Sequence, residues 1–347
     1  MVKINFNEKL FDTHLDKISK SISKLIKNLD KKNLEKSTIK CLEYLSEKKE
    51  IENLLKANTF QLELYIEYFK LEYPMSIGNG KKEKDWEELH QILRKEIFEK
   101  EYDNWGTRKI YGAYSFVKGL GLETCPYCNR NYTFLVDSEN GKLRPEIDHF
   151  YPKSIYPFLA MSFYNLIPSC SICNHTKSNK LEKDLENPYD IDNRSYRFTY
   201  IPKDIDFLLV KKEKYDFDNF EIKIIDENKN SKYFMKAKRL NWSDTKTKAL
   251  TLKDFQYQYN MFSMGSNIQL FKLDELYAQH KDVVLELLIK KSYYPRSYIK
   301  ELSTNFGFTT GDIYRYLLSN YKEDDNLHKR PLSKLVRDIV DELKLLN

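Results

Sequence analysis

The sequence predicts an α+β fold in four parts, and three observations support this prediction. Apolar residues recur with helical spacing through residues 1–105 and again through residues 243–347. Residues 106–188 contain paired cysteines among prolines, asparagines and histidines. Residues 189–242 contain β-branched and aromatic runs. We therefore expect a helical N-terminal region, a compact core around the cysteines, a small β-rich segment and a helical C-terminal region.

Composition sets broad limits on the class of protein. The 347 residues include 58 basic and 52 acidic side chains, a net charge of +6 that is compatible with nucleic acid without identifying it as a partner. There is no apolar run long enough for a transmembrane helix, and the N-terminal residues lack the apolar stretch of a signal peptide. We expect no membrane association and a cytoplasmic location.

The N-terminal region is predicted to be helical throughout. Apolar residues follow three- and four-residue spacing over residues 10–29 and 34–71. Pro74 and the glycines that follow it predict a loop. Asp85 is then a candidate N-cap for another helix. Such periodicity usually reports core packing, and a face that binds a partner is the alternative.

Strands and then further helices are expected after the core. The predicted strands are residues 196–201, 207–210 and 220–225, which are separated by turn-forming residues. Helical spacing returns over residues 270–289 and 312–346.

Four of the five cysteines form two Cys-x-x-Cys pairs, and Cys41 stands apart. The pairs are Cys125 with Cys128 and Cys170 with Cys173. Each pair presents two sulfurs on one side of a turn, so two pairs complete a tetrahedral thiolate site. The sequence predicts a structural zinc ion that ties together the ends of the intervening segment. Free buried cysteines, an iron centre and a redox pair are the alternatives.

Polar residues between and after these pairs match the needs of phosphodiester hydrolysis. His149 is suited to deprotonating water near neutral pH. Asp148 and the side-chain carbonyl of Asn174 are hard oxygen ligands for a divalent metal. Asn165, placed on a second strand, can hold the loop between the strands through its amide. Glu146 shares a strand face with Asp148 and is a candidate additional ligand.

These residues resemble the HNH, or ββα-metal, nucleases. The Asp-His pair, the later Asn and the Asn after the second cysteine pair match that family over residues 122–185, and the four cysteines resemble endonuclease VII-like and many bacterial HNH proteins. The resemblance implies two strands followed by a helix that opens with Asn174, and a DNA endonuclease. It also implies that Asp148 and Asn174 bind catalytic magnesium or manganese, that His149 activates water and that Asn165 orients the histidine loop.

A weaker resemblance extends to a biological role. The His-Phe-Tyr-Pro-Lys-Ser stretch at residues 149–154 and the tail at residues 328–335 are similar to HNH proteins of Septu and retron-associated anti-phage systems. This similarity implies antiviral defence with an ATPase partner. The chain has no P-loop, so ATP hydrolysis would belong to that partner.

Basic residues around the motif are candidate phosphate contacts, and a solvated surface is their alternative. They are Arg130, Arg144, Lys153, His175, Lys177 and Lys180. The other histidines lack metal-ligand spacing and are expected to be structural or exposed: His14, His90, His280 and His328.

Two other functions stay open at this point. One is a zinc-stapled nucleic-acid-binding or scaffold module without catalysis, and the other is an HNH nuclease that acts on RNA. A single HNH site cuts one strand, so double-strand cleavage would require a homo-oligomer, a partner or two successive nicks.

Overall fold

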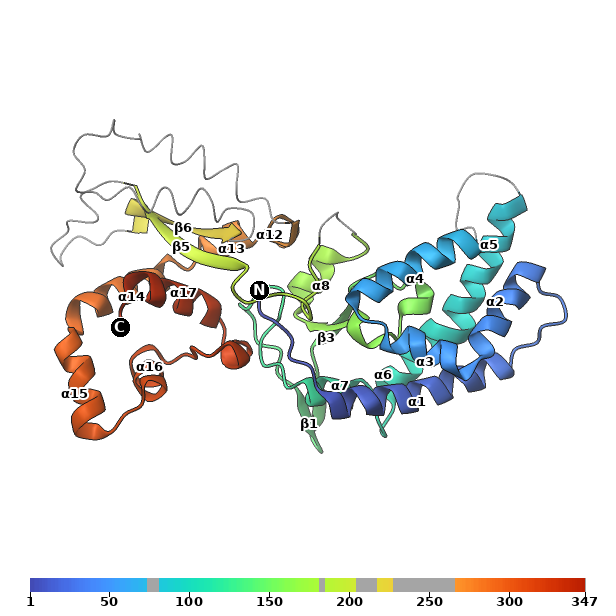
Figure 1. Ribbon diagram of the computed structural model, residues 1–347, viewed down its shortest axis with the longest axis horizontal. Helices are drawn as coiled ribbons and strands as arrows, with labels where there is room; N and C mark the ends of the chain where they lie inside the picture. Colours follow the sequence, from blue (N-terminus) through green and yellow to red (C-terminus); the bar gives the residue numbers. More distant parts are fainter. Residues whose placement is uncertain (74–80, 181–184, 204–216, 227–265, 347) are drawn as a thin grey trace.

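The computed structural model describes residues 1–73, 81–180, 185–203, 217–226 and 266–346. Within these residues helices predominate, and the strands form small two-stranded antiparallel sheets. The predicted mixture of helices and small sheets is therefore confirmed. In Figure 1 the N-terminal helices lie on the right and the C-terminal helices on the left, with the chain between the cysteine pairs at the centre.

The N-terminal region is a packed group of helices. They are α1 (Glu8–Lys27), α2 (Lys36–Ser46), α3 (Lys48–Lys56), α4 (Thr59–Glu72), α5 (Lys81–Gln91), the π-helical η1 (Ile92–Phe98), α6 (Glu99–Thr107) and α7 (Ala113–Leu120). The helix expected over residues 10–29 is confirmed by α1. Within the described residues, no helix has both the length and the apolar character that crossing a membrane requires.

Two details of this region differ from the predictions. The helical run over residues 34–71 divides into α2, α3 and α4, because Glu47 is extended and Asn58 starts α4 with a capping box to Gln61. The predicted N-cap at Asp85 is wrong, because α5 already begins at Lys81. The Lys and Glu residues before Asp85 are good helix formers and extend the helix. The loop predicted at Pro74 lies outside the described residues.

An aromatic cluster attaches the N-terminal helices to the central segment. The ring of His14 in α1 lies within 6.2 Å of Trp105 and 5.6 Å of Phe163, measured between centroids. Phe116 of α7 packs edge-on against both Trp105 and Phe163. All four side chains are fully buried, so α1, α6 and α7 form one core with the central segment.

The central segment contains two strands followed by a helix. After the exposed hairpin of β1 (Val136–Ser138) and β2 (Gly141–Leu143), β3 (Glu146–His149) pairs antiparallel with β4 (Leu166–Ser169). The helix α8 (Ser171–Lys177) follows and contacts β3. Between the strands lie the short 3-10 turns η2 (Pro157–Leu159) and η3 (Phe163–Asn165).

The C-terminal half packs helices against one strand pair. The strands β5 (Tyr196–Pro202) and β6 (Phe220–Asp226) pair antiparallel, which confirms two predicted strands, while residues 207–210 lie outside the described residues. The helical elements are α12 (Ser266–Leu270), α13 (Leu273–Tyr277), α14 (Lys281–Tyr293), α15 (Arg296–Phe306), α16 (Thr310–Leu318), η5 (Asp324–Lys329) and α17 (Ser333–Leu343). α17 packs against β5 and α14.

The buried side chain of Asn129 joins the first cysteine pair to the C-terminal region. Its Nδ2 donates hydrogen bonds to the carbonyl oxygens of Leu327 (3.1 Å) and Arg330 (3.3 Å). Its Oδ1 accepts from the Ser333 hydroxyl and the Lys334 backbone N–H, both at 3.0 Å. The tail at residues 328–335 therefore contacts the loop that carries Cys128.

Candidate functional site

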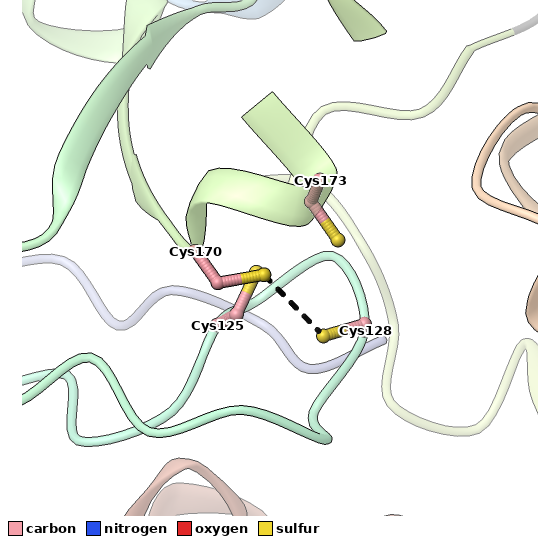
Figure 2. A group of neighbouring side chains, drawn as sticks. All are labelled: Cys125, Cys128, Cys170 and Cys173. Atoms are coloured by element: carbon pink, nitrogen blue, oxygen red, sulfur yellow. Dashed lines mark hydrogen bonds between the residues drawn. The ribbon is translucent and has the colours of Figure 1, made fainter. Parts of the chain in front are cut away.

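The four paired cysteines converge in one buried group. Their sulfur atoms all lie within 4.8 Å of one another, and all four side chains are buried. Figure 2 shows Cys125 and Cys128 on a loop, with Cys170 just before α8 and Cys173 on that helix. The fold thus places the sulfur atoms of two distant cysteine pairs in one cluster.

The geometry and polarity of this group fit a metal ion. Zinc–sulfur bonds of about 2.3 Å place sulfurs roughly 3.8 Å apart in a tetrahedron, and the Cys128 and Cys170 sulfurs are 4.0 Å apart. Asn129 has a positive φ of 49° that turns the loop back. The backbone N–H of Arg130 then donates to the Cys128 sulfur, and the Asn131 amide donates to the Cys170 sulfur. Such donors stabilise thiolate ligands, so the four cysteines can hold a metal ion.

His149 ends β3 with its imidazole buried. Its side chain is 7% exposed, and Nε2 lies 3.0 Å from the carbonyl oxygen of Ala160. A carbonyl only accepts, so Nε2 carries the proton and Nδ1 keeps its lone pair. Burial lowers the pKa of His149 to about 3, and the positive charges of Lys153 and Lys177 act in the same direction. The imidazole is therefore neutral at pH 7.

Asn165 holds the loop that follows His149. Its Oδ1 accepts from the Tyr151 N–H at 2.7 Å, and its Nδ2 donates to the carbonyl oxygens of Tyr151 (3.1 Å) and Leu159 (2.9 Å). The predicted placement on the second strand is wrong, because Asn165 ends η3 and β4 begins at Leu166. Its backbone N–H bonds to Ser162, which closes a 3-10 turn instead of extending the strand.

Asp148 faces two buried partners. Its Oδ2 accepts from the Tyr127 hydroxyl at 2.6 Å, and Lys177 Nζ lies 3.1 Å from each carboxylate oxygen. Lys177 also donates to the His149 carbonyl at 2.7 Å. Burial raises the pKa of Asp148 and lowers the pKa of Lys177, although each charge favours ionisation of the other. The Asp148 carboxylate thus already has a cationic partner.

Asn174 contacts a different carboxylate. Its Nδ2 donates to Glu146 Oε2 at 2.6 Å, and His175 Nε2 lies 3.5 Å from Glu146 Oε1. The side chains of Glu146 and His175 are 40% and 75% exposed, so this group faces solvent. The predicted helix start at Asn174 is wrong, because Cys170 precedes the first turn and α8 begins at Ser171.

The predicted divalent-metal ligands fit such an ion only in part. Glu146 and Asn174 lie side by side near the surface, but Asn174 turns its Nδ2 toward Glu146, so its amide would have to rotate to present the oxygen that magnesium or manganese requires. Asp148 lies on the same face of β3, but it is 4% exposed and its oxygens contact Lys177 and Tyr127. The joint binding of one divalent ion by Asp148 and Asn174 stays a prediction, because Asp148 contacts Lys177 and Tyr127 while Asn174 contacts Glu146.

The predicted phosphate contacts have different environments. Arg130 donates to His280 Nε2, and Lys153 pairs with Glu99 at 2.7 Å. Arg144 donates to the Pro145 carbonyl, and its guanidinium lies 5.8 Å from the Tyr114 ring centroid. Lys177 is fully buried and paired with Asp148, so it presents no charge at the surface for the predicted phosphate contact. The exposed members of the set are His175 and Lys180.

The site contains two tyrosines that the sequence did not predict. Tyr127 lies inside the first cysteine pair and hydrogen-bonds to Asp148. Tyr102 comes from α6, and its ring packs edge-on against the His149 ring with centroids 4.6 Å apart. The position of Tyr127 within Cys-Pro-Tyr-Cys was a local signal, whereas nothing in the sequence near Tyr102 indicates this contact.

No protein-family model, curated protein or solved structure matches this chain. Support for a function of this chain therefore comes from the geometry of the site and from the motif.

Proposed function

We propose that this chain is an HNH, or ββα-metal, endonuclease that hydrolyses phosphodiester bonds in DNA with His149 as general base. The observation that carries the proposal is the protonation state of the His149 imidazole. Its imidazole is neutral, and its protonated Nε2 is engaged by Ala160, which leaves Nδ1 as a proton acceptor. The order of β3, β4 and α8, closed by the four cysteines, supports the same assignment.

The chain holds this base from three sides. Lys177 fixes the His149 backbone carbonyl, Asn165 fixes the loop after it, and Tyr102 packs against the ring. A base held in one orientation accepts a proton from water without first losing conformational freedom. These three residues are positioning residues in the proposed site.

A divalent ion completes the proposed chemistry. When bound, it would stabilise the negative charge that develops on the phosphate. Glu146 and Asn174 are the accessible residues that could hold it, and Asp148 could join them if its contact with Lys177 were exchanged. At the four cysteines we propose structural zinc, because thiolate tetrahedra suit that ion and leave no open position.

The proposal also names a substrate and a partner protein. DNA is the expected substrate by the family resemblance, and RNA is the alternative. Antiviral defence and an ATPase partner are implied by the same resemblance and stay predictions. The second candidate function is a zinc-stapled binding module without catalysis, which the buried Asp148–Lys177 pair favours because it occupies a predicted metal ligand.

The decisive experiment is nicking of supercoiled plasmid with magnesium or manganese by the wild type and His149→Ala. Loss of a general base should lower the rate by about 100-fold or more. His14→Gln is the matched control, because His14 is another buried histidine whose Nε2 hydrogen-bonds to a carbonyl oxygen, that of Met161. It should keep its nicking activity at neutral pH.

Three results would count against the proposal. Equal nicking by His149→Ala would remove the assigned base. A loss of nicking in both histidine variants would point to a folding defect and would leave the catalytic role of His149 without support. No cleavage of DNA or RNA by the wild type, alone or with a partner, would favour the binding module. Circular dichroism and the zinc content of each variant distinguish misfolding from lost chemistry.

A further inference from the structure

The helix α4 is apolar on two faces, and one of them is exposed. Its inner face buries Leu62 and Phe69 completely. Its outer face presents Phe60, Leu64 and Leu71, which are 66%, 53% and 82% exposed. Spacings of four and seven residues place these three side chains in one row along the helix. A row of large exposed apolar side chains is characteristic of a surface that binds another molecule.

A pocket rich in carboxylates adjoins this row. It has a volume of about 540 Å³ and shares Phe60 with the row. Its acidic lining residues are Glu63, Glu186, Asp190 and Asp192. Among the described residues that line it, none is Lys, Arg or His. The described lining therefore brings four carboxylates and no cationic side chain next to an apolar surface.

These two features together define the chemistry of the occupant. The row from Phe60 to Leu71 is about 16 Å long at 1.5 Å per residue, the length of three helical turns. The carboxylates would attract a cationic side chain and would repel the phosphates of a nucleic acid. A helix laid against α4 would bury the apolar row and direct a basic side chain into the pocket.

We propose that α4 and the adjoining acidic pocket form a docking surface for a helix of a partner protein. That helix carries a row of apolar side chains flanked by lysine or arginine. In Figure 1, α4 runs along the upper edge of the N-terminal helices. The surface does not include the residues proposed to carry out catalysis.

The position of the pocket connects this surface to the proposed catalytic strand. Phe150 and Tyr151 line the pocket, and they directly follow His149. The Tyr151 hydroxyl donates to Glu63 Oε1 at 2.9 Å, which links α4 to the loop held by Asn165. The basic side chain that enters the pocket would therefore contact the loop that follows His149.

The test measures binding of a fluorescent synthetic amphipathic helix made of leucine and lysine to the full chain, by anisotropy. A peptide with glutamate in place of lysine is the matched probe. Leu64→Ser should weaken binding of the leucine–lysine peptide about tenfold, since losing a leucine that becomes buried in the complex costs of the order of 1.5 kcal/mol. Asp190→Asn combined with Asp192→Asn should weaken it to a similar degree and reduce its dependence on salt.

Control variants carry comparable changes at sites outside this surface. Phe306→Ser alters another exposed apolar side chain, 68% exposed in α15, and Glu139→Gln alters an exposed carboxylate beside β1. Both should bind the leucine–lysine peptide as the wild type does.

Several results would overturn the proposal. Equal binding of the leucine–glutamate peptide would show that charge does not select the occupant. Equal weakening by the control variants would remove the assigned location, and displacement of the peptide by duplex DNA would assign the surface to nucleic acid. Because no cleavage is measured, a chain that nicks plasmid but fails this test would lose the docking surface and keep the proposed function.

Discussion

At the residue scale, the main feature of the site is the buried contact between Lys177 and Asp148. Two opposite charges are held away from water. Burial raises the pKa of Asp148 and lowers the pKa of Lys177, so it favours the neutral form of each group. A buried ion pair adds little net stability, but breaking it leaves an uncompensated charge. Lys177 also donates to the His149 carbonyl, so the pair connects stability of the core to placement of the proposed base.

Lys177→Met should destabilise the protein by about 3 kcal/mol, because it leaves the Asp148 carboxylate buried without a cation. Urea unfolding at pH 7.5 measures this loss. The matched variant is Lys177→Met with Asp148→Asn, which removes both charges and should recover most of the stability. A single variant as stable as the wild type would mean that the pair is neutral or open to water.

Burial of His14 predicts a dependence of stability on pH. Its Nε2 lies 2.7 Å from the Met161 carbonyl oxygen and its Nδ1 lies 2.8 Å from the Tyr111 hydroxyl, and burial lowers its pKa from 6.5 to about 4. A depressed folded-state pKa contributes stability that is present above the unfolded value of 6.5. This stability is lost as the pH falls toward 4, because the unfolded chain binds the proton first.

The free energy of unfolding should therefore fall by about 2 kcal/mol between pH 7.5 and pH 5 through His14 alone. His14→Gln should have lower stability at pH 7.5 but a smaller loss on acidification, by about that amount. Urea titrations of both proteins at the two pH values measure the difference. Identical losses in the two proteins would exclude His14 as a source of the acid sensitivity.

At the scale of elements, the side-chain amide of Asn165 joins distant points of the loop between β3 and β4. Asn165→Ala removes three hydrogen bonds to Tyr151 and Leu159 and leaves buried backbone groups unpaired. We expect a loss of roughly 2 kcal/mol in stability and a larger proportional loss of nicking than of folded protein. Asn267→Ala is the control, because Asn267 is also fully buried and its side-chain amide bonds to the backbone N–H and carbonyl of Glu186, outside this loop. Equal nicking per folded molecule in both variants would remove the positioning role of Asn165.

The sequence predicted the types of elements better than their limits. The strand ending in His149 and the strands β5 and β6 were found, because β-branched and aromatic runs with turn residues between them are local signals. The start of α8 was placed too late, since Cys170 precedes the helix without a side-chain cap hydrogen bond. The sequence predicts a strand at Asn165, where the structure has a turn, because the hydrogen-bond partners of its side chain lie across the loop.

The candidate site was predicted in part for a similar reason. Cysteine spacing is a local pattern, so the four-cysteine group could be anticipated. The partners of Asp148 could not be, because Tyr127 and Lys177 approach it from segments 21 and 29 residues away. The exposure of the outer face of α4 depends on how the N-terminal helices pack, which helical periodicity alone does not specify.

At the scale of the whole molecule, the cysteine group lies where the central segment meets the C-terminal half. Asn129 bonds to the tail at residues 328–335, and the Tyr277 hydroxyl donates to the Cys128 carbonyl at 2.6 Å. A metal ion held by the cysteines would therefore fix a loop that contacts both α13 and the start of α17. Metal binding would thus stabilise distant parts of the chain.

Cys173→Ser should lose the bound metal and lower the melting temperature by roughly 10 °C, the effect of losing several kcal/mol in a chain of this size. Hydrogen exchange should accelerate at residues 327–335 and in α17, although these lie over 150 residues from Cys173 in sequence. Exchange in α2 and α3 should stay as in the wild type.

Cys41→Ser is the control, because Cys41 is buried within α2 and outside the four-cysteine group. Elemental analysis of both variants measures the metal. Unchanged exchange in α17 after metal loss would show that Asn129 holds the tail without help from the ion, and the C-terminal half would then be stable independently of the cysteine group.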